Sequence, residues 1–174
     1  MNQVNLAPKT KKLLAIGTVG VVVVAVAFVA VLALLIKNAP THRPTITAFA
    51  DGRSVTVEPY LYCPVDAPLC ENDGVSSTVP VRKGHPLQLS LPTEITSAPW
   101  IVAAVYADAD GGAVESDTLY LPGQKTGLTV QPLDDEGREL LGVEIRLPSG
   151  IIDTDTQQEE IVSHAIWSIA TKSD

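Results

Sequence analysis

The chain has 174 residues and a formal charge of -8, yet 45% of its residues are hydrophobic and only 18% are charged. That combination is unusual for one evenly mixed soluble domain, so the apolar residues must be concentrated in one part of the chain. The length allows about one domain with appendages. Composition alone excludes neither a membrane protein nor a globular one, and it identifies no activity.

One segment, residues 13–36, accounts for the excess of hydrophobic residues, because it is an apolar stretch of 24 residues without a charge. At about 1.5 Å per residue a helix of this length reaches roughly 36 Å, enough to cross a hydrocarbon core of about 30 Å. A signal peptide has a shorter apolar region, with small residues at a cleavage site close behind it. Here the nearest such pattern, residues 48–50, lies twelve residues further on. We therefore expect an uncleaved transmembrane helix, surrounded by membrane lipid.

The charges beside this segment predict its orientation. Three lysines in residues 1–12 precede it, against Lys37 and Arg43 after it. This is a modest positive-inside bias, which places residues 1–12 in the cytoplasm. Residues 37–44 then form a linker, and residues 45–174 form a domain outside the cytoplasmic membrane.

The outer part is strongly acidic. Residues 44–174 hold all twenty Asp and Glu against seven Lys and Arg, a formal charge of -13. Nucleic acid and anionic lipid surfaces would repel such a domain, so neither is expected as a partner. The acidity indicates either solubility alone or a basic protein partner.

Short alternating stretches separated by Pro and Gly predict a β domain from Thr45 onward. The expected strands are residues 45–50, 54–58, 78–82, 86–91, 100–107, 117–121, 127–131, 142–147 and 164–171. The expected turns are Asp51-Gly52, Lys83-Gly84, Asp110-Gly111-Gly112, Pro122-Gly123 and Ser149-Gly150. This pattern indicates an antiparallel sandwich of the immunoglobulin or fibronectin kind, with a closed barrel as the alternative. Trp100 opens the most apolar stretch and is the expected core anchor.

Two segments, the tail at residues 156–171 and the acidic stretch 134–139, allow more than one interpretation. Residues 156–159 fit a capping box that would start a helix, and the apolar residues of 161–169 fit a helical stripe. Residues 165–171 also read as a buried strand, and we prefer a loop followed by that strand. The acidic residues 134–139 could form one helical turn, but a solvated connection is the preferred interpretation.

The two cysteines, Cys63 and Cys70, lie in one loop of the outer domain. In an oxidising compartment a local disulfide is the natural expectation. The six intervening residues exclude a C-x-x-C redox motif. Two thiols with the distant His85 and His164 do not make a zinc ligand set.

Other candidates for chemistry are weak. Asp108 and Asp110 have the spacing of a calcium loop, but the remaining ligands are missing, so a hairpin turn is expected. Ser149 is not in a nucleophile elbow, and no base is evident for it among the histidines. No phosphate-binding glycine loop occurs. We therefore expect no cofactor, no metal and no enzymatic activity.

Several segments resemble a family of membrane-anchored proteins of unknown function from mycolic-acid-containing actinobacteria. They are residues 48–52 (AFADG), 59–63 (PYLYC), 86–92 (PLQLSLP), 98–100 (APW) and 165–170 (AIWSIA). The resemblance implies a single N-terminal span with an extracytoplasmic β domain, and it supplies no catalytic residues. In the same bacteria, respiratory and envelope-building complexes carry small single-span accessory subunits that this layout resembles.

The sequence supports two functional hypotheses. The leading one is a non-catalytic accessory or assembly subunit of an integral membrane complex, contacted through the helix and the outer domain; the first candidate is a respiratory cytochrome oxidase supercomplex. The other is an extracytoplasmic binding module for an envelope lipid or glycan, with Tyr60, Tyr62 and Trp167 as possible contacts. A cavity between the two sheets would favour the binding module.

Overall fold

The computed structural model describes residues 8–38, 43–70, 74–82, 84–152 and 157–172, with side chains from Gly17 to Thr171 in these ranges. The chain divides into two compact units, Met1–His42 and Arg43–Asp174. The first contains the helix α1 (Pro8–Lys37), which begins five residues before the expected span and ends one residue after it. Its stretch Gly17–Lys37 is long and apolar enough to cross a membrane, as membrane anchors and signal sequences both are.

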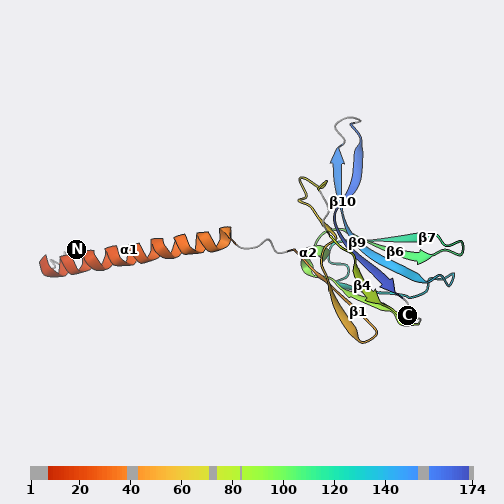
Figure 1. The fold of residues 1–174 in the computed structure, drawn as a ribbon. Helices are drawn as coiled ribbons and strands as arrows, with labels where there is room; N and C mark the ends of the chain where they lie inside the picture. Colours follow the sequence, from red (N-terminus) through yellow and green to blue (C-terminus); the bar gives the residue numbers. More distant parts are fainter. Residues whose placement is uncertain (1–7, 39–42, 71–73, 83, 153–156, 173–174) are drawn as a thin grey trace. The chain divides into compact units, whose positions relative to one another are not determined.

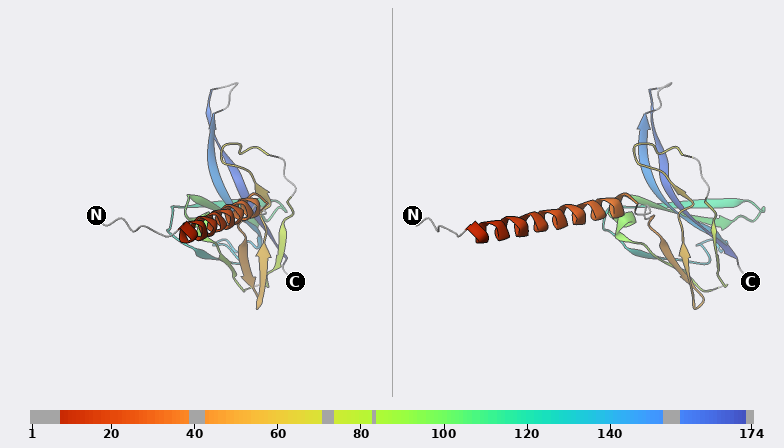
Figure 2. Two further views of the ribbon diagram at one scale, coloured as in Figure 1. Left: turned by 90° about the vertical axis from the view of Figure 1, so that its left-hand side faces the viewer. Right: turned by 60° about the vertical axis from the view of Figure 1, so that its left-hand side comes forward.

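The second unit consists of two β-sheets (Figures 1 and 2). The small sheet has the order β2-β1-β5-β8, formed by β1 (Ile46–Ala50), β2 (Arg53–Val57), β5 (Leu87–Ser90) and β8 (Gly127–Val130). The large sheet has the order β3-β10-β9-β6-β7, formed by β3 (Leu61–Tyr62), β6 (Trp100–Ala107), β7 (Ala113–Tyr120), β9 (Leu140–Ile152) and β10 (Glu159–Lys172). A short helix, α2 (Thr93–Thr96), connects β5 to β6.

One further strand, β4 (Ser77–Pro80), pairs with β10 on the same edge as β3. This pairing is parallel, whereas the other strand pairs among the described residues are antiparallel. The expected antiparallel sandwich is therefore confirmed, with one parallel edge strand added.

The strand order is that of an immunoglobulin-like sandwich. Immunoglobulin domains place strands A, B, E and D in one sheet and C, F and G, with C′ in variable types, in the other. Here β1-β5-β8 follows the order A-B-E, and β10-β9-β6-β7 follows the order G-F-C-C′. Trp100, the first residue of β6, is fully buried, and β6 corresponds to the strand that carries the core Trp in immunoglobulin domains. The prediction of Trp100 as the core anchor is confirmed.

Alternating side chains from both sheets build the core, because successive residues of a strand point to opposite faces. The buried core residues of the small sheet are Ile46, Ala48, Ala50, Val57, Leu87, Leu89 and Val130. Those of the large sheet's four long strands are Trp100, Val102, Ala104, Tyr106, Leu140, Val143, Ile145, Leu147, Ala165, Trp167 and Ile169. Apolar residues on β5 and β9 thus take the positions of the inter-sheet disulfide of antibody domains.

The tail of the chain forms a strand, so the preferred interpretation of residues 164–171 is confirmed and the helical alternative is excluded for them. The hairpin β9–β10 is longer than the sequence predicts and extends beyond the sandwich (Figure 1). The expected turn at Ser149-Gly150 is wrong, because both residues lie in β9 and pair with β10. Pro148 is tolerated here because β6 pairs with β9 only as far as Arg146.

The turn at Asp51-Gly52 is confirmed, with φ of 58° and 76° at the two residues. Two successive positive φ values are what a two-residue hairpin of type I′ requires. The segment Asp108–Gly112 also forms the expected hairpin turn, since the N–H of Asp108 donates to the carbonyl of Gly112 at 2.9 Å. Residue 83, part of another expected turn, lies outside the described residues, as does residue 156 of the expected capping box.

The disulfide Cys63–Cys70 closes the loop that follows β3. Cys63 is buried, and its N–H donates to the carbonyl of His164 at 2.7 Å, which attaches this loop to β10. Closing a ring of about eight residues reduces the entropy of the unfolded chain. The disulfide therefore stabilises the edge of the large sheet at β3 and β10.

Trp167 connects the start of the second unit to its last strand. Its indole N–H donates to the carbonyl of Pro44 at 2.9 Å, and both residues are buried. The indole N–H of Trp100 is also buried but has no hydrogen-bond partner among the described residues. The two tryptophans are thus a matched pair, alike in burial and different in hydrogen bonding.

We expect Trp167→Phe to lower the free energy of unfolding by about 1–3 kcal/mol more than Trp100→Phe does, because only the first leaves a buried carbonyl without its donor. Urea unfolding of the full chain in detergent, followed by tyrosine and tryptophan fluorescence, measures the difference. Equal losses in the two variants would contradict a stabilising role for the Trp167–Pro44 hydrogen bond.

Reduction of the disulfide should lower the free energy of unfolding by about 2.5 kcal/mol, the loop-entropy value for a ring of this size. The measurement is urea unfolding of the full chain with and without a phosphine reductant. The variant Cys63→Ser with Cys70→Ser is the control, because its unfolding must not respond to the reductant.

Candidate functional site

The large sheet extends one strand beyond the small sheet on the side of β7 and β8. β7 pairs with β6 throughout its length, so the residues of β7 opposite the core residues of β6 point toward the inside of the sandwich. These residues are Val114, Ser116, Thr118 and Tyr120. Ser116 and Thr118 are nevertheless exposed. The inner face of β7 is therefore left uncovered by the small sheet.

A cleft of about 410 Å³ follows this uncovered face. Val102, Ala104 and Tyr106 of β6 form its floor, β7 forms one wall, and Leu128 and Val130 of β8 form the other. Clefts of this size hold small ligands in many proteins. Its lining is mixed, with apolar side chains on the floor and hydroxyl groups on the β7 wall.

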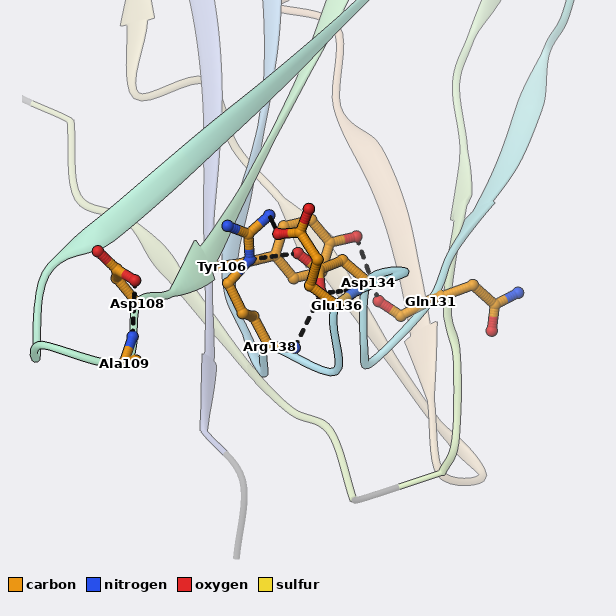
Figure 3. Close-up of polar contacts among 7 residues, drawn as sticks. All are labelled: Tyr106, Asp108, Ala109, Gln131, Asp134, Glu136 and Arg138. Atoms are coloured by element: carbon orange, nitrogen blue, oxygen red, sulfur yellow. Dashed lines mark hydrogen bonds and ion pairs between the residues drawn. The ribbon is translucent and has the colours of Figure 1, made fainter.

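Residues of the loop between β8 and β9 line and close one end of the cleft. Figure 3 shows the polar contacts within this loop. The Nε of Arg138 lies 2.6 Å from Oδ2 of Asp134, and its Nη2 lies 2.5 Å from Oε2 of Glu136. The other oxygen of Asp134 accepts the backbone N–H groups of Glu136 and Arg138 at 3.0 and 2.8 Å. The segment is therefore a largely exposed connection, as the preferred interpretation expects, and not a helical turn; one carboxylate orders it.

The same contacts determine the titration of Asp134. Burial raises its pKa, but hydrogen bonds from the backbone and the guanidinium of Arg138 outweigh this effect and hold the pKa below its ordinary value. The pKa of the Tyr106 phenol is raised, first by burial and then by the charges of Asp134 and Asp135. Among the described residues that line the cleft, Arg138 is the single cation, so the three carboxylates of the loop leave this end of the cleft acidic.

A cross-strand ion pair on the outer face of the large sheet supports the β7 wall. Arg146 of β9 reaches across β6 to Glu115 of β7, with Nη1 2.7 Å from Oε1, and it also binds Glu144 at 2.7 Å. Ala103 of β6 lies between the two strands and is fully buried although it faces outward. The hydrogen bond from Arg146 lowers the pKa of Glu115. β7 is thus attached to β9 as well as to β6.

The aromatic residues proposed as ligand contacts lie elsewhere. Trp167 is fully buried in the core, and the half-buried Tyr62 packs edge-on against it at 6.3 Å between ring centroids. The N–H of Tyr60 donates to the carbonyl of Ile166 at 2.7 Å, which places it on the β10 edge. None of the three lines the cleft.

The two histidines considered as candidates for chemistry have different neighbours. His85 lies 3.8 Å from Asp51 at the β1–β2 turn, which also binds Arg82, whereas Nδ1 of His164 lies 3.2 Å from the carbonyl of Cys63. Ser149 lies within β9, and Oδ1 of Asp108 accepts the N–H of Ala109 in the hairpin turn. Among the residues with described positions, no group of three or more His, Cys, Asp or Glu could hold a metal ion.

The cleft residues were not among the sequence candidates. The predicted strand at 117–121 began four residues too late, so Val114 and Ser116 were not recognised as members of one face. The available signal was the alternation of residues 113–120, in which Val114, Ser116, Thr118 and Tyr120 share a face. Nothing local to β7 indicates that the opposite sheet stops at β8.

Comparisons with known proteins identify a family but name no activity. Residues 39–172 match the family described as "Protein of unknown function (DUF2771)". Uncharacterised proteins of Mycobacterium bovis (strain AF2122/97) and Mycobacterium tuberculosis (strains H37Rv and CDC 1551) are each 32% identical over 137 residues, covering 78% of this chain and 82% of the relative. No solved structure matches the chain significantly.

We expect acid to loosen the 131–139 loop only below the ordinary pKa of an aspartate, about 3.9. Because the folded-state pKa of Asp134 is depressed, its stabilising effect is complete above that ordinary value and is lost as the pH falls through the lower folded value. Hydrogen exchange of residues 131–139 against pH measures this loss. In Arg138→Gln the folded-state pKa of Asp134 moves back toward its ordinary value, so the acid-dependent loss should be smaller and should be complete at higher pH. An unchanged profile would contradict the role of Arg138.

Proposed function

The chain belongs to the family of proteins of unknown function DUF2771, and we propose that it is a non-catalytic accessory or assembly subunit of a membrane complex. Its helix is the anchor, and its immunoglobulin-like domain is the part that contacts the partner outside the cytoplasmic membrane. The observation that carries this proposal is the cleft between the two sheets: the centre of the domain is packed, but the edge at β7 and β8 is not filled.

Two features support the extracytoplasmic membrane setting. The stretch Gly17–Lys37 has the length and composition of a span, and it contains no ionisable side chain before Lys37. The disulfide Cys63–Cys70 is of a kind that persists in oxidising compartments and is rare in the cytosol. The positive-inside bias agrees, because it directs the β domain outward.

A span without ionisable groups carries no proton or ion path, so its contribution is attachment or lateral packing. The β domain then provides specificity, because side chains and strand edges are presented there. The resemblance to single-span accessory subunits makes a respiratory cytochrome oxidase supercomplex the first complex to test. An envelope lipid or peptidoglycan machine is next.

A second candidate function is the binding of an envelope lipid or glycan. The volume of the cleft favours this function, because a fully packed domain would leave no space for a ligand. The contacts would then come from Tyr106, Ser116 and Thr118 rather than from the aromatic residues first considered. Mass spectrometry of the detergent-purified chain tests this candidate. A stoichiometric lipid or glycan that is lost in Thr118→Trp would establish it.

For the subunit proposal, the full chain with a tag after Asp174, expressed at native level and solubilised in mild detergent, should migrate on native gels with a larger membrane complex. Mass spectrometry then identifies a fixed set of partner proteins. A variant with residues 13–36 replaced by an unrelated apolar helix separates the two contacts, since retention of the complex assigns binding to the β domain. Recovery of the free monomer alone would overturn the proposal.

A further inference from the structure

We propose that the cleft between β7 and β8 binds an extended segment of a partner protein, which adds a strand to β8 and carries a basic residue at the end beside the 131–139 loop. This inference rests on the proposed function, because it names how the β domain contacts its partner. It uses three separate observations: the strand order, the lining of the cleft, and the charge at its closed end.

The strand order leaves one position of the small sheet without a strand. In immunoglobulin domains strand D lies beside strand E and faces C′ across the sandwich. Here the chain passes from β7 directly to β8 through residues 121–126, and β8 pairs with β5 alone within the described ranges. The inner face of β7 is consequently uncovered, and the cleft occupies the position of strand D.

The exposed edge of β8 offers backbone groups to such a segment. A strand at the edge of a sheet presents unpaired N–H and C=O groups, and extended peptides bind many domains by pairing with them. β8 offers four residues, Gly127–Val130, or about 13 Å of strand. A segment of four to six residues therefore matches the edge.

The lining of the cleft selects the side chains of the segment. Alternate residues of an added strand would point inward, toward Val102 and Ala104 on the floor and toward Ser116 and Thr118 on the β7 wall. Small β-branched residues suit both surfaces, because valine packs on the apolar floor and threonine can also pair with the hydroxyl groups. Large aromatic residues would meet the partly buried Tyr120, which already stacks on Trp100 at 4.5 Å.

The charge at the closed end selects a basic residue. Asp135 is exposed and lines the cleft beside the pair formed by Asp134 and Arg138. A Lys or Arg of the segment would reduce this excess negative charge. A second copy of this chain is disfavoured as the occupant, because its own domain of charge -13 would be repelled.

The test uses the full chain in detergent micelles and three blocked six-residue peptides of alternating Val and Thr. One peptide has Lys at its N-terminal end, one has Lys at its C-terminal end, and one has Glu in place of Lys. Hydrogen exchange and NMR titration should show that a Lys peptide binds and protects amides of Gly127–Val130, with at least five-fold weaker binding of the Glu peptide. The better Lys peptide also gives the strand direction.

Matched variants separate this site from general attraction to an acidic domain. Thr118→Trp fills the cleft and should abolish binding, whereas Leu119→Trp places the same ring on the outer face of β7 and should leave it unchanged. Asp135→Lys should weaken the Lys peptide about five-fold and improve the Glu peptide. Asp66→Lys makes the same change of charge in the disulfide loop and should have little effect.

Equal effects of Asp135→Lys and Asp66→Lys, or protection that excludes Gly127–Val130, would overturn the strand inference. It would also be overturned if cleft amides responded to a glycan or a lipid micelle and not to any peptide. In cells, a native complex that persists in Thr118→Trp would overturn the inference but leave the subunit proposal standing. A wild-type chain that forms no complex would overturn the subunit proposal itself.

Discussion

The unequal width of the two sheets is the constraint on which the functional features of this domain depend. A β-sandwich is stable where the inner face of each sheet covers the other, because apolar side chains from both faces fill the space between them. β10, β9 and β6 meet this condition, since their inward residues belong to one buried cluster. β7 does not, and its inward residues include the exposed Ser116 and Thr118. The chain thus has hydroxyl side chains on β7, where the small sheet no longer covers the large one.

Polar contacts on the outer face of the large sheet and in the 131–139 loop compensate for the missing cover over β7. Arg146 attaches β7 to β9 across the small side chain of Ala103, so β7 does not depend on inner packing alone. Arg138 and Asp134 order the loop at the end of the cleft, although the same residues could have formed a free connection. On the opposite edge, the disulfide and the hydrogen bond from Trp167 to Pro44 attach the loop after β3 and the start of the domain to β10. The open edge is therefore held in shape by polar contacts, whereas the centre is held by packing.

Much of this fold could be predicted from local patterns, and the site could not. A short apolar run identified Trp100–Ala107 as a strand with correct bounds, and the turn residues Asp51-Gly52 identified a hairpin, because both signals depend on neighbouring residues only. Ser149-Gly150 was misread as a turn because its pairing with β10 is not visible in the local sequence. The cleft depends on which strand ends each sheet, a property of topology that residues 113–120 do not encode by themselves. The role of Asp134 was hidden for the same reason, since its partner Arg138 could equally have faced solvent.

The proposed anchor and the proposed strand site support each other in energetic terms. A segment of four to six residues pairing with β8 would bind weakly as a free peptide, because ordering an extended chain costs roughly 1–2 kcal/mol per residue for the backbone. Attachment of both partners to one membrane makes the encounter effectively intramolecular, with effective concentrations that reach the millimolar range for short tethers. Weak strand pairing is then sufficient for occupancy of the cleft inside a complex. The same weakness keeps the exposed edge of β8 from pairing with unrelated chains. The charge of -13 on the outer part of the chain further opposes such pairing when those chains are acidic.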